Sequence, residues 1–135
     1  MKTAVIYWSG TGNTEQMAAA VAEGAGAELF SVSDFSGDVA DYDRIAFGCP
    51  SMGDEVLEES EFEPFFASVE SKLSGKKIAL FGSYGWGDGQ WMRDWSERAK
   101  AAGAEVTNGE GLIINDAPDE NGLAGCKALG EALVK

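Results

Sequence analysis

An alternation of five apolar runs with stretches of helical periodicity constrains the fold of this chain more than any other feature. Each run has the length of a strand, and together they cover residues 4–8, 28–32, 44–49, 77–82, and 106 with 112–114. Apolar strands that alternate with helices are typical of a parallel sheet covered on both faces. Because crossovers in such sheets are right-handed, the pattern predicts an α/β fold with a three-layer, doubly wound, five-stranded parallel sheet.

The stretches between the strands carry apolar residues at helical spacing. Helices are predicted at residues 13–25, 62–73, 89–102 and 123–133. Ser60 and Glu63 have the spacing of a capping box before the second helix, and Gly103 is a C-terminal glycine for the third. Residues 33–43 are polar and predict mainly loop. Glycines at 109 and 111 predict that the fifth strand is broken there.

Length and charge exclude several classes of protein. The 135 residues suit a single domain spanning 1–135, and no apolar run reaches the ~18 residues that span a bilayer. Without a signal-like leader, we expect a cytoplasmic protein that binds no membrane. The net charge of −13 argues against nucleic-acid binding. Charge alone favours solubility and docking to basic redox partners about equally.

The two cysteines give no sign of a metal site. Cys49 and Cys126 lie far apart, and the chain contains no histidine. Zinc sites use closely spaced cysteine and histidine ligands, so no metal is expected. Both residues are predicted to be buried free thiols in a reducing compartment.

Ligands of doubly wound sheets bind beyond the carboxyl ends of the strands, which directs attention to three loops. The first loop (residues 9–14, Ser-Gly-Thr-Gly-Asn-Thr) joins a strand to a helix and is rich in hydrogen-bond donors. It lacks the lysine of a nucleotide-hydrolysing P-loop, and Glu15 occupies the third glycine position of the dinucleotide fingerprint. The loop therefore predicts one terminal phosphate held by neutral donors at a helix N-terminus. The alternative is a structural turn and helix cap.

The other two loops offer surfaces for a flat ring. The second loop (residues 50–55) contains Met52, whose thioether suits an aromatic face; taken alone, the loop is more typical of an acidic surface turn with Met52 in the core. In the third loop (residues 83–89), three glycines surround Trp86, which indicates a stacking surface. Trp91 and Trp95 have helical spacing and are predicted to lie in the core. One phosphate and one flat conjugated ring together fit FMN, whereas NAD leaves its second phosphate and adenine without a site.

At these three loops the sequence resembles the short-chain flavodoxins of anaerobic bacteria, and the likeness runs from end to end. The resemblance implies a flavodoxin-like sheet of strand order 2-1-3-4-5. It also implies a monomeric, low-potential one-electron carrier that uses non-covalently bound FMN and shuttles mainly between semiquinone and hydroquinone. Such a protein is not an enzyme with its own substrate; it serves redox partner proteins, such as pyruvate:flavodoxin-type oxidoreductases or hydrogenases.

The resemblance also implies the cofactor-binding residues. Hydroxyl and amide groups of the first loop would bind the phosphate, Met52 and Trp86 would cover the two ring faces, and Glu55 would accept a hydrogen bond from the flavin. The expected set is Trp8, Ser9, Gly10, Thr11, Gly12, Asn13, Thr14, Pro50, Ser51, Met52, Gly53, Asp54, Glu55, Ser83, Tyr84, Gly85, Trp86, Gly87 and Asp88.

Two rival interpretations share the predicted topology. A flavin-dependent quinone or FMN reductase needs space for nicotinamide over the flavin, which Trp86 would block, and usually a basic contact for its phosphates. A phosphate-receiving signalling domain needs acidic residues after its first strand and an aspartate at the end of its third. The chain has Ser9-Gly10 and Cys49-Pro50 at those places, so the signalling domain ranks far lower.

Overall fold

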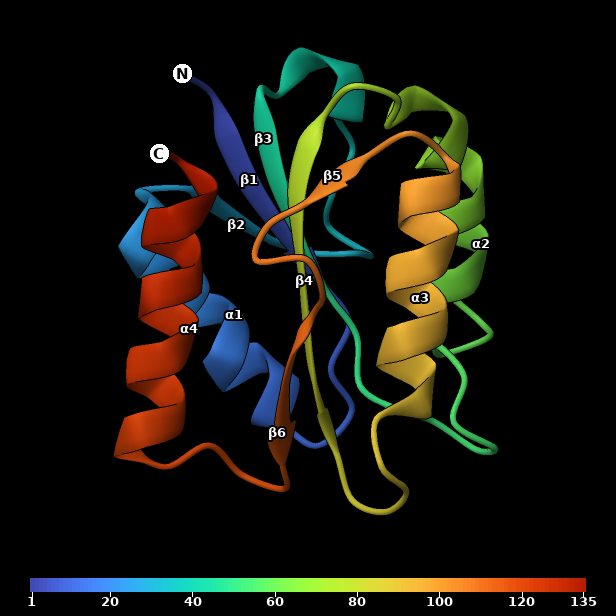
Figure 1. Ribbon diagram of the computed structural model, residues 1–135, viewed down its shortest axis with the longest axis vertical. Helices are drawn as coiled ribbons and strands as arrows, with labels where there is room; N and C mark the ends of the chain where they lie inside the picture. The colour runs from blue at the N-terminus through green and yellow to red at the C-terminus, as the bar shows by residue number, and fades with distance from the viewer.

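The computed structural model describes residues 1–135 and shows a parallel sheet between two layers of helices (Figure 1). The strands are β1 (Thr3–Tyr7), β2 (Glu28–Ser31), β3 (Arg44–Gly48), β4 (Lys77–Tyr84), β5 (Glu105–Val106) and β6 (Leu112–Asn115). Every pairing is parallel, in the order β2-β1-β3-β4-β5. The predicted doubly wound sheet and its 2-1-3-4-5 order are confirmed.

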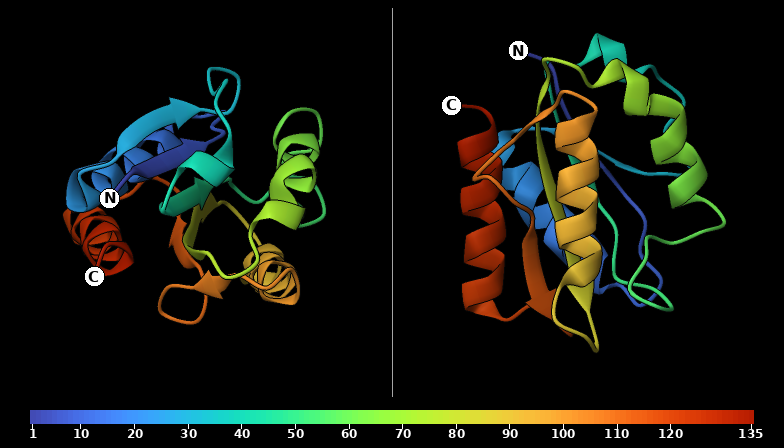
Figure 2. Two further views of the ribbon diagram at one scale, coloured as in Figure 1. Left: turned by 90° about the horizontal axis from the view of Figure 1, so that it is seen from above. Right: turned by 45° about the vertical axis from the view of Figure 1, so that its right-hand side comes forward.

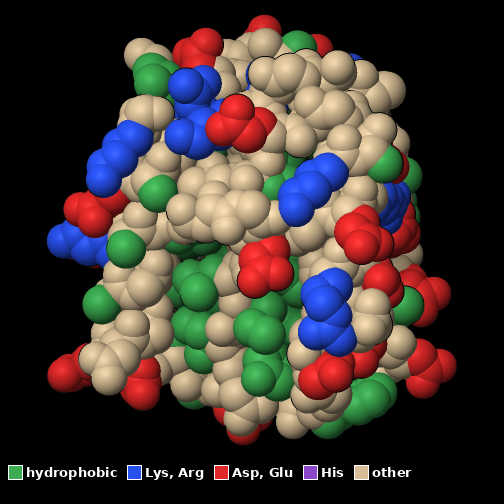
Figure 3. Space-filling model, in the orientation of Figure 1, with side chains coloured by type: hydrophobic (Ala, Val, Ile, Leu, Met, Phe, Trp, Pro, Cys, Tyr) green, Lys and Arg blue, Asp and Glu red, His purple; other side chains and the backbone are tan.

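The predicted break in the fifth strand is also confirmed. β5 and β6 both pair with β4, so they share one edge position, with Val106 beside Ile78 and Leu112 beside Phe81. Residues 107–111 therefore stand opposite only residues 79 and 80 of β4, and the excess chain forms a loop. Figure 3 shows hydrophobic side chains gathered over this edge, where β6 is half-buried.

The helices are α1 (Asn13–Ala25), α2 (Phe62–Val69), α3 (Gln90–Ala101) and α4 (Glu120–Leu133), with 3-10 turns at Val39–Asp41 and Glu70–Lys72. α1 and α4 cover one face of the sheet, and α2 and α3 cover the other (Figures 1 and 2). The predicted second helix extended to residue 73, but its last turn tightens into the 3-10 segment. None of the helices is both long and apolar enough to cross a membrane.

Each face of the sheet has its own buried core. The core beneath α2 and α3 is aromatic: Trp95 meets Phe62 and Phe66 edge-to-face at ring-centroid distances of 5.5 and 5.7 Å. Trp91 and Trp95 are both buried there, as predicted. The core beneath α1 and α4 is built from smaller side chains such as Val21.

The cysteines are buried free thiols, as predicted. Cys49 directly follows β3 and belongs to the aromatic core, and Cys126 lies in the core beneath α4. Burial raises the pKa of the Cys126 thiol to about 11 and raises the pKa of Cys49 still further. Because the thiolate is the nucleophilic and metal-binding form, neither thiol is reactive at neutral pH.

The predicted capping box before α2 is wrong. Ser60 and Glu63 do not cap the helix; the Glu63 carboxylate binds the Arg98 guanidinium at 2.7 Å, and the Ser60 hydroxyl donates to Glu58. The Glu58 carboxylate instead accepts hydrogen bonds from the amides of Glu61 and Phe62, at 2.8 Å each. The Glu58 side chain, which comes from the loop before α2, thus satisfies free amides at the start of the helix. The serine was expected to do this.

Close packing of α1 against α4 depends on glycines. A methyl group added at Gly130 would lie 2.1 Å from the carbonyl oxygen of Val21, and one added at Gly24 would lie 2.0 Å from the carbonyl oxygen of Lys127. Each glycine faces the backbone of the other helix, which cannot move aside as a side chain can. The two helices can approach this closely only without side chains at these positions.

Substitution of Gly130 by alanine is therefore expected to force α1 and α4 apart. The Gly130→Ala variant should lose about 1–3 kcal/mol of unfolding free energy, the usual cost of overpacking, measured by urea denaturation. Gly125→Ala is the matched control, because it lies on the same helix with no atom within 4 Å of an added methyl group. That control should be neutral or gain up to about 1 kcal/mol from helix propensity. Equal effects of the two variants would contradict this account.

Candidate functional site

The three loops predicted from the sequence converge at the carboxyl ends of β1, β3 and β4, at the lower edge of the sheet in Figure 1. They surround an open cavity of about 220 Å³. Its walls contain no lysine or arginine, and Asp116 is the one charged residue. The lining residues are Trp8, Gly10, Thr11, Asn13, Pro50, Ser51, Met52, Ser83, Tyr84, Gly85 and Asp116.

The first loop is held in shape by its own side chains. The Ser9 hydroxyl accepts from the amides of Gly12 and Glu15 at 3.1 and 3.2 Å, and the Thr11 hydroxyl accepts from the Asn13 amide at 3.4 Å. Ser9 therefore closes the loop from inside and does not line the cavity. The loop enters α1 directly, at Gly12 with φ 97°, a left-handed conformation that glycine adopts without strain.

Several amides of this loop remain available to a ligand. Gly12 provides no side-chain cap for α1, and the amides of Gly10, Thr11 and Thr14 donate to no acceptor within the chain. Free amides at a helix N-terminus, where the helix dipole is positive, favour an anion. The local structure thus fits a phosphate group bound by neutral donors.

A buried hydrogen bond joins the first loop to the third. The hydroxyls of Thr14 and Ser83 lie 3.0 Å apart, and the Ser83 amide also donates to the Thr14 hydroxyl at 3.3 Å. The two residues are only 1% and 5% exposed. The Thr14 side chain, expected among the phosphate ligands, is thus engaged within the protein, and it fixes the distance between the two loops.

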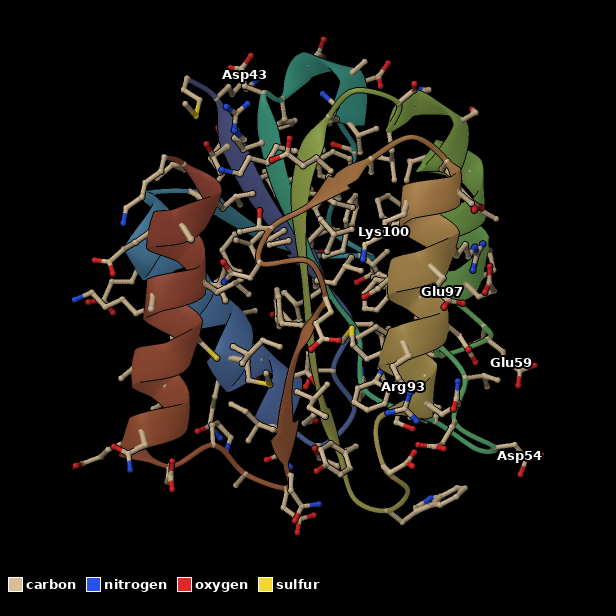
Figure 4. All side chains as sticks on the ribbon, viewed as in Figure 1. Asp43, Asp54, Glu59, Arg93, Glu97 and Lys100 are labelled. Carbon is tan, nitrogen blue, oxygen red and sulfur yellow. The ribbon has the colours of Figure 1, made fainter.

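The second loop is a tight turn closed by a bridge. The backbones of Met52 and Val56 exchange two hydrogen bonds of 2.9 Å, and Gly53 and Glu55 both have left-handed φ angles, of 51° and 58°. The Met52 side chain lies at the cavity with part of its surface exposed. Asp54 projects from the turn into solvent, as Figure 4 shows.

The second loop contacts the third through Glu55. Its carboxylate accepts from the Gln90 amide at the start of α3, at 3.3 Å, and lies against Gly87, where an added methyl group would be 2.3 Å from its oxygen. Glu55 therefore stands at the junction of the two loops and not in the cavity wall. A side chain at position 87 would disrupt this junction.

The third loop forms the outer rim of the cavity. Trp86 is 61% exposed, whereas Trp91 and Trp95 are buried. A tryptophan side chain is highly buried on average, so the exposure of Trp86 is unusual. Asp88 pairs with Arg93 at 2.9 Å, beside the cavity. The expected residues Gly53, Asp54, Trp86, Gly87 and Asp88 do not line the cavity; they follow lining residues of the second and third loops, and we call them its rim. The expected residues Ser9, Gly12, Thr14 and Glu55 do not line the cavity either.

The sequence analysis did not single out Asp116. It follows β6, has a φ of 57°, and donates its amide to the Tyr84 carbonyl at 2.8 Å. Its carboxylate lies near Gly85 at the cavity. The signal for Asp116 in the sequence is its position directly after the second half of the broken fifth strand, because ligands of doubly wound sheets bind beyond strand ends.

This fold and cavity define a class of protein: a doubly wound α/β domain with an open cavity beyond the carboxyl ends of its strands, next to free amides at a helix N-terminus. The model of the Flavodoxin family matches residues 5–130. The chain is 52% identical over 122 residues to the flavodoxin of Clostridium beijerinckii, covering 86% of this chain and 88% of that one. It is 50% identical to the flavodoxin of Megasphaera elsdenii, covering 97% of both chains.

A solved structure agrees with these matches. The solution structure of two-electron reduced Megasphaera elsdenii flavodoxin superimposes with a TM-score of 0.85, at 42% identity in that alignment and with 98% of each chain covered. The chain belongs to the flavodoxin family, and its size is that of the short-chain members.

Membership of this family establishes the activity. Flavodoxins are electron-transfer proteins and not enzymes, and they bind FMN. This chain is therefore an FMN-dependent, low-potential one-electron carrier that serves redox partner proteins. FMN supplies the redox chemistry by cycling mainly between semiquinone and hydroquinone, and the protein supplies binding, orientation and electrostatics.

The link between the first and third loops leads to a testable expectation. In Thr14→Val, the Ser83 amide and hydroxyl lose a buried partner, which should cost about 1–3 kcal/mol of unfolding free energy, measured by urea denaturation without FMN. Thr11→Val provides the control, because its hydroxyl is exposed and makes one long hydrogen bond. A Thr14→Val protein as stable as this control would show that the link does not hold the loops together.

Proposed function

We propose that the three loops hold FMN in the cavity between them, in one domain formed by residues 1–135. One observation supports this most strongly: free amides at the N-terminus of α1 lie beside a cavity that no cationic side chain lines. The first loop would bind the phosphate through Gly10, Thr11 and Asn13, with Trp8 beside it. FMN needs a binding site of this kind, since its phosphate is single and its ring uncharged.

The remaining residues would contact the ring system. Met52 and Trp86 would cover its two faces, and the backbone of the third loop would bind its polar edge. Glu55, which contacts the Gln90 amide after the third loop, would accept a hydrogen bond from the ring, and Asp116, which lines the cavity, would join this set. Ser9, Gly12 and Thr14 would act by shaping the first loop.

Partner proteins would dock at the rim through opposite charge. Asp54 and Glu59 both point outward from the segment around the second loop (Figure 4), and the chain carries 23 acidic residues against 10 basic ones. Partners with basic surfaces would associate faster at low salt. We further propose that the protein acts as a monomer in the cytoplasm.

Titration with FMN tests the proposed site. FMN fluorescence should be quenched on binding, and the endpoint should correspond to one FMN per chain. An assay for NAD(P)H consumption with added quinone separates the carrier from a flavodoxin-like reductase, and no turnover is expected. A protein that leaves FMN fluorescence unchanged would disprove the site, and steady NAD(P)H consumption would favour the reductase.

The exposed Trp86 is the most direct test of ring stacking. Trp86→Ala should raise the dissociation constant for FMN about twofold to tenfold, because aromatic stacking contributes about 0.5–1.5 kcal/mol beyond buried area. Trp86→Phe is the matched control and should retain most of the affinity, since a flat ring is kept. If Trp86→Ala binds FMN as tightly as the unmodified protein, Trp86 does not cover the ring.

A further inference from the structure

We propose that Glu58 is a positioning residue of the flavin site: its buried carboxylate holds the backbone that follows the second loop and places a fixed negative charge behind that loop. The inference depends on the proposed function, in which these loops hold FMN. Glu58 lies outside the cavity wall and was not among the residues expected to bind the cofactor.

Glu58 is only 6% exposed, and both oxygens of its carboxylate accept hydrogen bonds from the protein. One oxygen accepts from the amides of Glu61 and Phe62 at 2.8 Å each, and the other accepts from the amide and the hydroxyl of Ser60. Burial alone would favour the neutral acid. These donors outweigh burial and lower the pKa of Glu58, so the group is ionised at neutral pH.

The first contact of this carboxylate leads to the first loop. Glu61, whose backbone amide Glu58 holds, accepts a hydrogen bond from the indole nitrogen of Trp8 at 3.2 Å. Trp8 lines the cavity, and its ring lies 3.0 Å from the position of a methyl group added at Gly10. A change in the backbone at Glu61 would therefore move the indole that borders the phosphate-binding amides.

A second contact of Glu58, made by its backbone amide and not by its carboxylate, leads to the start of the second loop and the end of β4. The Glu58 amide donates to the Cys49 sulfur at 3.4 Å, and the Cys49 carbonyl accepts from the Trp91 indole at 3.2 Å. The same carbonyl would lie 2.1 Å from a methyl group at Gly82, directly before the third loop. Cys49 and Glu58 thus fix both ends of the segment that contains the second loop.

The charge of Glu58 differs from that of the other acids nearby. Glu59 carries the same formal charge one residue away, but it is exposed and points outward (Figure 4). Solvent and salt screen an exposed charge strongly and a buried charge much less. Adding the second electron to FMN adds negative charge to the site, so Glu58 should oppose that step more than Glu59 does.

The test compares two variants, each as the FMN-loaded protein. Glu58→Gln removes a buried negative charge, and Glu59→Gln removes an exposed one. We expect Glu58→Gln to raise the equilibrium constant for the second reduction step about tenfold, which for one electron is about 59 mV. Glu59→Gln should change it less than twofold. The readout is the potential of the second step by spectroelectrochemistry, which a purely structural role of Glu58 would leave unmoved.

Glu58→Asp separates position from charge. It keeps the charge but shortens the side chain, so it should weaken FMN binding severalfold in a fluorescence titration while leaving the second potential near that of the unmodified protein. If Glu58→Gln does not fold, Ser60→Ala, which removes one donor and no charge, should also weaken FMN binding, but less than Glu58→Asp.

Two results would overturn the inference. In the first, Glu58→Gln has the same second potential and the same FMN affinity as Glu59→Gln. In the second, Glu58→Asp and Ser60→Ala both bind FMN as tightly as the unmodified protein. Either can occur while the unmodified protein binds FMN normally, and then the proposed function stands. Failure of the unmodified protein to bind FMN would instead refute the proposed site itself.

Discussion

The parallel pairing of β1, β3 and β4 is the constraint on which the rest of the structure depends. Parallel strands end at the same edge of a sheet, so three loops far apart in the sequence meet there without any contact of their own specifying it. The register pairs Tyr7 with Gly48 and Gly48 with Phe81. The sheet thus gathers the backbone donors of the first loop and the thioether of Met52 at one cavity.

Once the loops meet, hydrogen bonds between them determine the shape of the cavity. Thr14 and Ser83 join the first and third loops, and Glu55 joins the second to the start of α3. Glu58 holds the segment after the second loop, through its backbone contact with Cys49 and its carboxylate contact with the Glu61 amide. Most of these side chains turn away from the cavity. Their polar groups are satisfied by protein, which leaves the backbone amides of the first loop as the available donors. In the proposed site, these neutral donors would let an acidic chain hold a phosphorylated cofactor without a cationic residue.

Much of the fold and site could be predicted from local patterns. Strand-length apolar runs, helical spacing and the glycines at 109 and 111 indicated the correct elements, because these depend on periodicity and backbone freedom along the chain. The burial of Trp91 and Trp95 followed from their helical spacing in the same way. The capping of α2 could not be predicted, because Ser60 has a common capping spacing while Glu58 reaches the helix only through the path of the preceding loop. Asp116 was missed because β6 continues an interrupted strand.

The sequence by itself determined the doubly wound class, the three loops and a ligand with one phosphate and a flat ring. Each of these is encoded in contiguous residues whose conformational preferences are local. Only the tertiary structure decided which side chains line the cavity and which support it, since that depends on the direction each one takes when distant segments pack. Serine and threonine in a donor-rich loop look alike in the sequence, yet the hydroxyls of Ser9 and Thr14 are engaged in hydrogen bonds within the protein.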